Sequence, residues 1–144
     1  MSPSSKDLEI AYASGVRALC HKYNILFIAD EVRVGCGKTG QFLSSDYLTT
    51  DPKTKEALPK PDLLTLGKSI TGGMYPATYV LERSACMGLV GTREIMSTFG
   101  FSPVAVAATT AALKFIDEEE LVEKALYVER VFLEVTSTWK ENEG

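Results

Sequence analysis

Two apolar stretches that each end in a chemically reactive side chain constrain the fold most strongly. Residues 25–29 are followed by the acid pair Asp30-Glu31, and residues 63–66 are followed closely by Lys68. Short aliphatic runs of this kind are typical of strands buried in a parallel sheet. In open α/β sheets, ligands bind beyond the carboxyl ends of the strands. The pattern therefore predicts an α/β fold in which Asp30 and Lys68 share one crevice.

Helical spacing of apolar residues and capping signals predict the elements around these strands. The helix before the first strand, to about residue 23, has an apolar stripe that we expect to be buried: Leu8, Tyr12, Val16 and Leu19. A second helix is expected from Ser102-Pro103 to about residue 116, because serine caps helices and proline suits their first position. The other expected elements are a strand over 77–81, a short helix over 84–89 and an amphipathic helix over 119–140. This order predicts a mostly parallel sheet with flanking helices.

Composition excludes several classes of function. The chain has 144 residues, 45% of them hydrophobic, and a net charge of −4. It is large enough to bury a core, but it has neither the basic stripe of a nucleic-acid-binding protein nor an apolar run long enough to span a membrane. We expect no nucleic-acid or membrane partner.

Cysteine usage and the amino end bear on the compartment and on metal binding. The three cysteines are widely spaced, and the only histidine, His21, adjoins Cys20 on the expected first helix, where neighbouring residues do not share a face. We therefore expect reduced thiols and no metal site. No signal or transit peptide is recognised, so we expect a cytoplasmic location.

A glycine-rich segment follows the first strand and leaves two interpretations open. Residues 32–40 contain Gly35, Gly37 and Gly40 together with Arg33 and Lys38, which resembles a phosphate cradle. The spacing fits neither the dinucleotide fingerprint nor the P-loop. The alternative is a turn whose glycines let the backbone approach a ligand or a neighbouring subunit.

The chemistry of the two strand ends is suited to pyridoxal 5'-phosphate. A lysine that directly follows a buried strand is expected to lose solvent, which favours the neutral amine that forms a Schiff base. The pyridine ring acts as an electron sink when its nitrogen is protonated, and Asp30 could hold that proton. Ser97 and Thr98 lie in a later hydroxyl-rich segment and could donate hydrogen bonds to the phosphate.

Four segments resemble the second half of the large domain of class III aminotransferases. They read LFIADEV, TGQF, PDLLTLGKSITGGMYP and STFGFSP. The GGMYP segment is similar to the corresponding segment in the branch of the family that acts on ornithine. The resemblance implies an incomplete large domain of the fold type I class of pyridoxal-phosphate enzymes. Residues 1–118 would be the partial cofactor-binding domain, and residues 119–144 a helix leading towards an absent carboxyl-terminal domain.

The resemblance also implies roles for individual residues. Asp30 matches the acid that pairs with the pyridinium nitrogen, and Lys68 matches the Schiff-base lysine, which later serves as general base. Thr98 matches a threonine that reaches the cofactor phosphate of the other subunit in a dimer. Arg33 occupies the position of a glutamine that contacts the ring hydroxyl, and Phe101 with Ser102 replaces the usual glycine and asparagine. The implied reaction transfers the δ-amino group of ornithine to 2-oxoglutarate, giving glutamate 5-semialdehyde and glutamate.

Segments of the family that have no counterpart in this sequence lead to a second hypothesis. The family's earlier half and its carboxyl-terminal domain, which hold the substrate, have no counterpart in the 144 residues. We therefore expect weak or absent activity in this chain alone, and oligomerisation or a complementary chain to cover exposed sheet surfaces. The alternative is a non-catalytic interaction module derived from the same fold. A dinucleotide-dependent oxidoreductase is disfavoured because GxGxxG is missing.

Overall fold

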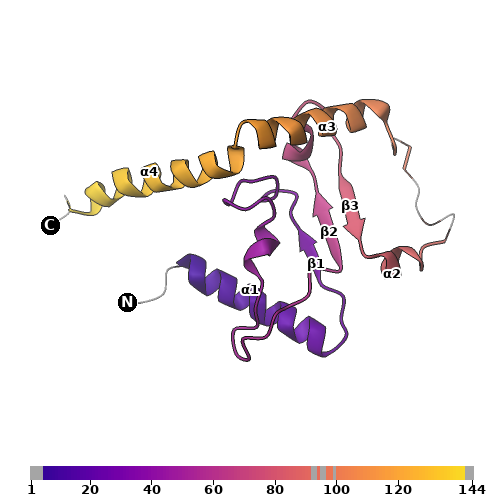
Figure 1. Cartoon of the computed structure of the whole chain (residues 1–144), viewed down its shortest axis with the longest axis horizontal. Coiled ribbons are helices and arrows are strands. Elements are labelled where there is room, and N and C mark those ends of the chain that lie inside the picture. Colours follow the sequence, from indigo (N-terminus) through magenta and orange to yellow (C-terminus); the bar gives the residue numbers. More distant parts are fainter. Residues whose placement is uncertain (1–4, 92–93, 95–96, 99, 142–144) are drawn as a thin grey trace.

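The computed structural model describes residues 5–91, 94, 97–98 and 100–141. Its elements form a small three-stranded sheet with helices beside it and along one end (Figure 1). In chain order they are α1 (Ser5–Lys22), β1 (Ile28–Asp30), η1 (Ser44–Tyr47), β2 (Leu63–Leu66), η2 (Lys68–Thr71), β3 (Tyr79–Glu82), α2 (Ser84–Met87), α3 (Pro103–Glu118) and α4 (Leu121–Glu141). The positions of the expected helices and strands are confirmed to within a few residues, with β1 shorter than predicted.

The strand pairings place the carboxyl ends of β1 and β2 at the same edge of the sheet. β1 and β2 are parallel, with Asp30 opposite Thr65. β3 pairs antiparallel with β2, on the side of β2 away from β1, so the sheet is mixed. The helix α3 lies along the edge at which β1 and β2 end, and it packs against η2, the turn that follows β2 (Figure 1).

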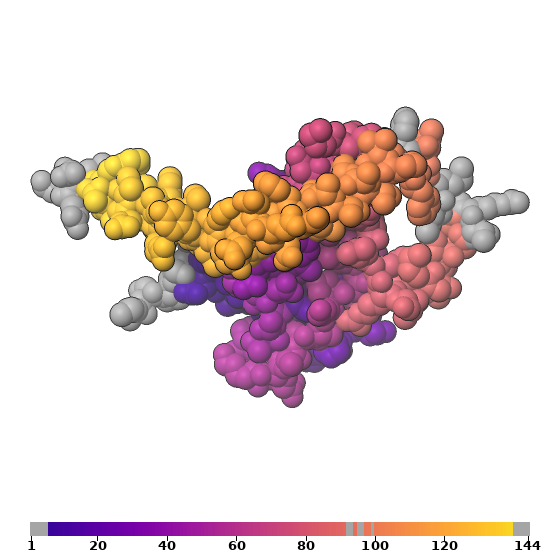
Figure 2. All heavy atoms as spheres, turned by 45° about the horizontal axis from the view of Figure 1, so that its top comes forward, coloured from indigo at the N-terminus to yellow at the C-terminus, as the bar shows by residue number. Residues whose placement is uncertain are grey.

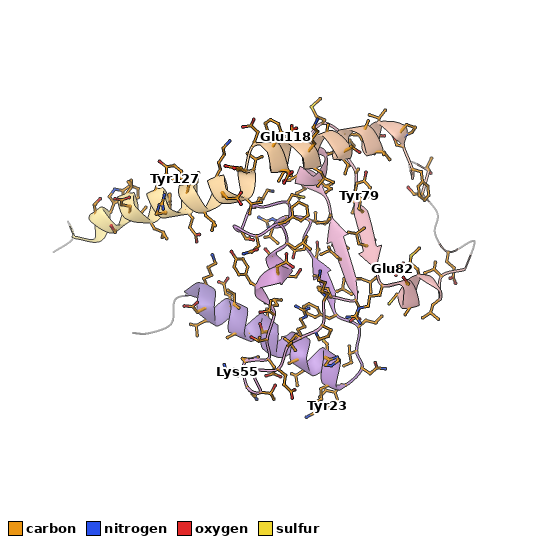
Figure 3. The ribbon with its side chains drawn as sticks, viewed as in Figure 1. Tyr23, Lys55, Tyr79, Glu82, Glu118 and Tyr127 are labelled. Carbon is orange, nitrogen blue, oxygen red and sulfur yellow. The ribbon has the colours of Figure 1, made fainter. Side chains whose placement is uncertain are left out.

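The two faces of the sheet differ in how they are covered, because side chains alternate along a strand. One face carries Leu66, which joins Cys36 and Ile70 in the buried core together with partly buried residues that include Leu64, Tyr79 and Ile116. The Tyr79 hydroxyl also lies 2.8 Å from Thr109 Oγ1 on α3 (Figure 3). The opposite face carries Asp30 and Thr65 and is open, since Ile28 and Val80 on it are exposed.

The buried face of α1 differs from the expected one. Tyr12 is 75% exposed, and Leu8 and Leu19 are also exposed, whereas Ser14 and Arg17 are buried. Arg17 explains the difference, because its Nη1 donates hydrogen bonds to the carbonyls of Ser45 and Leu48 beside η1. The prediction of an apolar buried stripe was therefore wrong: the helix docks through its polar side.

The carboxyl end of α1 is formed by a local backbone motif centred on Asn24. Asn24 adopts a left-handed conformation with φ of 53°. Its N–H donates to the carbonyl of His21, and the N–H of Ile25 donates to that of Cys20. This is the hydrogen-bond pattern of a Schellman motif, in which asparagine tolerates the left-handed position. It ends the helix and turns the chain towards β1.

The glycine-rich segment proves to be a turn packed against α4. Side chains at Gly37 and Gly40 would be 3.0 Å from Val122 Cγ2 and 2.6 Å from Leu126 Cγ, respectively. The close approach is therefore to this chain's own helix, and the interpretation as a turn is supported over that as a phosphate cradle. Beyond this contact α4 projects from the body (Figure 2), and its apolar residues Val128, Phe132 and Val135 are exposed.

Candidate cofactor site

Asp30 ends β1 and presents an ionised carboxylate on the open face of the sheet. Its Oδ1 accepts hydrogen bonds from the backbone N–H of Val32 at 3.1 Å and from Thr65 Oγ1 at 2.9 Å. These bonds, the first more than the second, lower the pKa of Asp30 below its usual value. Both bonds end on Oδ1, so Oδ2 is available to a further donor. The arrangement suits a carboxylate that must stay charged beside a cation.

Thr65 is a site residue that sequence reasoning missed. It lies opposite Asp30 in the parallel register of β1 and β2, and its hydroxyl orients that carboxylate. The available signal was a hydroxyl at the third position of the otherwise aliphatic segment LLTL. Only the register shows which acid such a hydroxyl meets.

Glu31, the second member of the acid pair, has a structural role. It is 3% exposed, and its two carboxylate oxygens accept hydrogen bonds from the backbone N–H groups of Ser44 at 2.9 Å and Ser45 at 2.6 Å. Its own N–H donates to the carbonyl of Thr65 at 2.9 Å. Glu31 therefore fixes the first residues of η1 to the end of β1, and only Asp30 of the pair is free to meet a ligand.

Lys68 follows β2 at the first position of η2 and adopts a left-handed backbone conformation with φ of 49°. Such a conformation is strained for a residue with a Cβ atom, and strained residues cluster at functional sites. The side chain is exposed, so the described residues do not provide the loss of solvent expected from its place after a buried strand.

A pocket of about 670 Å³ adjoins Lys68. The pocket is mostly apolar and lies between the glycine-rich turn, η2, α3 and α4. Its walls include Cys36, Lys38, Gly72, Ala112, Phe115 and Leu121. Asp30 does not line it. The structure thus brings Asp30 and Lys68 to the same end of neighbouring strands, while the pocket beside the lysine is separate from the open face that carries the acid.

The other predicted site residues lie apart from this pair. Arg33 is exposed in the glycine-rich turn, where its carbonyl accepts a hydrogen bond from Lys38 Nζ at 3.2 Å. Ser97 and Thr98 are exposed in the segment between α2 and α3, and no hydrogen bond of the described residues joins them to Asp30 or Lys68. A role for these two hydroxyls in this site stays a prediction that requires a second subunit.

The thiol of Cys36 is expected to react more slowly with iodoacetamide than those of Cys20 and Cys86. Cys36 is 7% exposed, and its burial, opposed by nearby Lys38, raises the pKa of the thiol. A lower thiolate fraction and poorer access both slow alkylation. Peptide mapping after timed labelling at neutral pH should show severalfold slower modification of Cys36, and labelling in urea should remove the difference. Equal rates in the folded chain would contradict the packing described for the core.

Two further findings concern metals and membranes. Within the ranges described above, no group of three or more His, Cys, Asp or Glu side chains is arranged to hold a metal ion. Across the same residues, no helix combines the length and the apolar character needed to cross a bilayer.

Comparison with known proteins agrees with this geometry. The family model for class III aminotransferases matches residues 8–143. Ornithine aminotransferase 1 of Staphylococcus saprophyticus is 41% identical over 111 residues, which cover 77% of this chain and 26% of that protein.

Solved structures give the same result. An ornithine aminotransferase from Toxoplasma gondii superimposes with a TM-score of 0.76 and 31% identity, covering 87% of this chain and 27% of that one. It is described with partial occupancy of pyridoxal phosphate at its active site. An acetylornithine aminotransferase from Elizabethkingia anophelis gives a TM-score of 0.80 and 33% identity over 92% of this chain and 32% of that one.

The chain spans about a quarter of the length of the curated relatives it matches. Its incomplete sheet corresponds to part of the fold type I architecture of these pyridoxal-phosphate-dependent enzymes. With the family model covering nearly every residue, and with an ionised aspartate and a lysine after adjacent parallel strands, the chain belongs to the class III aminotransferases.

Proposed function

We propose that this chain is part of an ornithine-type aminotransferase in which Asp30 and Lys68 hold pyridoxal phosphate. The observation that carries the proposal is the parallel pairing of β1 with β2, which sets both residues after the same end of neighbouring strands. Residues 1–118 form the partial cofactor-binding domain, and α4 leads towards a further domain.

The residues present fit the cofactor. The lowered pKa of Asp30 keeps its carboxylate charged, and Oδ2 can hold a proton on the ring nitrogen. Lys68 Nζ is exposed, so it can attach covalently to a carbonyl and, when released, move a proton on the substrate. The cofactor, when bound, supplies the electron sink for transamination. Arg33 lies in the turn after Asp30 and donates to the ring hydroxyl. Ser97 donates to the cofactor phosphate, and Thr98 donates to the cofactor phosphate of a partner subunit.

The proposed reaction transfers the δ-amino group of ornithine to 2-oxoglutarate, giving glutamate 5-semialdehyde and glutamate. The names of the relatives support this choice of substrates. Because the chain covers only about a quarter of their length, its activity alone is weak or absent and a complementary chain or second copy completes the site. The three free thiols agree with a reducing, cytoplasmic location.

A second candidate function is a non-catalytic interaction module. The exposure of Ile28 and Val80 on the open face of the sheet favours it, since such a face commonly packs against another protein. This candidate requires no cofactor at Lys68.

The test is to incubate the purified chain with pyridoxal phosphate, reduce with borohydride and map the modified lysine. We expect label on the peptide that contains Lys68, loss of that label in Lys68→Arg, and an unchanged result in Lys38→Arg, whose lysine lines the same pocket. Absence of label on the Lys68 peptide would favour the interaction module. Addition of ornithine and 2-oxoglutarate should give very low turnover, and a normal enzymatic rate would contradict the incomplete site.

A further inference from the structure

We propose that a cavity at the carboxyl end of α1 binds a small oxyanion such as inorganic phosphate. The cavity is separate from the proposed cofactor site, measures about 210 Å³ and is lined by residues that include Arg17, His21, Lys60, Asp62 and Arg83. At about 30 Å³ for each water, it holds one small anion with a few waters. It is smaller than the roughly 300 Å³ or more of sites for drug-sized ligands.

Arg17 supplies the main reason to place an anion there. It is 4% exposed, and the hydrogen bonds it donates to protein carbonyls both start from Nη1. Its Nε is buried and has no hydrogen-bond partner among the described residues. The edge formed by Nε and Nη2 is one of the two forks with which arginine binds carboxylate or phosphate. Nη2, the other donor of this edge, makes no hydrogen bond within the described residues, and an oxyanion in the adjoining cavity would accept one from it.

The charges that line the cavity leave room for an anion. Arg17, Lys60 and Arg83 are cationic, and Asp62 is the single carboxylate among the lining residues. One oxygen of Asp62 pairs with Arg83 at 3.3 Å, and the other accepts a hydrogen bond from the N–H of Phe27 at 2.8 Å. Asp62 therefore balances one of three positive charges. Burial, and after it the nearby charge of Arg83, lowers the pKa of the Arg17 guanidinium, while Asp46 and Asp62 act in the opposite direction. A bound anion would relieve the repulsion between the two arginines.

The end of α1 opposes this binding only weakly. The carboxyl end of a helix carries partial negative charge on its free carbonyls. Here the carbonyls of Cys20 and His21 already accept hydrogen bonds from Ile25 and Asn24. The three cations that line the cavity, Arg17, Lys60 and Arg83, therefore dominate its charge.

The experiment is a titration of the ¹⁵N-labelled full chain with sodium phosphate at constant ionic strength, followed by amide chemical shifts. We expect saturable changes confined to residues 17–27, 59–62 and 83, with sulfate competing and chloride without effect. Arg83→Gln and Lys60→Gln should each weaken binding about tenfold, as expected for loss of a charge-assisted hydrogen bond. Lys55→Gln is the matched control, because Lys55 is exposed in the same segment between η1 and β2 as Lys60 but does not line the cavity (Figure 3).

Three results would overturn the proposal. Shifts that rise linearly with phosphate would show no specific site, and equal weakening in Lys55→Gln would show general attraction to surface charge. Shifts centred on Lys68 would place the anion in the proposed cofactor site instead. Because two variants remove different cations, unfolding of one, detected by circular dichroism, leaves the other to decide. Failure of this proposal would leave labelling of Lys68 by pyridoxal phosphate unaffected.

Discussion

Replacement of Glu31 by alanine is expected to lower the free energy of unfolding by about 3–5 kcal/mol, because it removes two hydrogen bonds to a charged acceptor, each worth about 1.5–3 kcal/mol. Its carboxylate accepts hydrogen bonds from the N–H groups of Ser44 and Ser45, and the side chain is almost fully buried. Removal leaves the buried N–H of Ser45 and the partly buried N–H of Ser44 without acceptors, and it leaves a cavity between β1 and η1. Urea denaturation followed by circular dichroism measures the change.

The adjacent acid provides a control for this prediction. Asp30→Ala removes a carboxylate one residue away, but that side chain is exposed and belongs to the open face. Its effect on stability is expected to be much smaller than that of Glu31→Ala, as is usual for surface positions. Similar losses in the two variants would show that Glu31 does not hold η1 in place.

Replacement of Asp30 by asparagine is expected to weaken binding of pyridoxal phosphate by roughly 10- to 100-fold, the value of a hydrogen bond between charged groups. Asparagine keeps the shape of the side chain and can still accept a hydrogen bond from Thr65, but it cannot stabilise a proton on the ring nitrogen. Absorbance titration of the chain with the cofactor measures the affinity, and Glu56→Gln, which alters an exposed acid on a distant loop, is the control.

The pH dependence of this effect follows from the lowered pKa of Asp30. The hydrogen bonds from Val32 and Thr65 favour the ionised form, so their contribution to stability is fully present above the unfolded-state pKa. It is lost only as the pH falls below the ordinary value of 3.8 and through the lower pKa of the folded chain. Between neutral and mildly acidic pH, Asp30 should therefore remain charged and contribute equally to cofactor binding. An affinity that fell in that range in wild type but not in Asp30→Asn would contradict the assignment.

Local sequence signals predicted most of the elements. Pro103 begins α3 as expected, although the Ser102 side chain makes no capping hydrogen bond. The apolar runs before Asp30 and Lys68 form strands, and the placement of both residues at one edge of the sheet follows from a parallel pairing. The strands and their shared end were predicted because they depend on conformational preferences of neighbouring residues and on the rule that parallel strands end together. The crevice that Asp30 and Lys68 were expected to share stays a prediction, because Asp30 does not line the pocket beside Lys68.

The predictions that failed concern which surfaces meet. The apolar residues of α1 suggested one buried face, yet Arg17 docks the opposite face onto the carbonyls beside η1. Burial of Lys68 was expected because a buried strand precedes it, but Lys68 is exposed. Elements far from it in the chain would have to pack over its side chain to bury it.

The sequence by itself determined the family, the order of elements, and the two residues proposed to hold the cofactor. Short motifs identify the family and the two residues, and the periodicity of apolar residues predicts the order of elements. Only the tertiary structure decided that Asp30 faces the open side of the sheet with Thr65 while Glu31 is buried under η1. The physical reason is that register and docking depend on contacts between residues far apart in the chain. A one-residue step along a strand reverses the face a side chain occupies, and no local pattern encodes what covers that face.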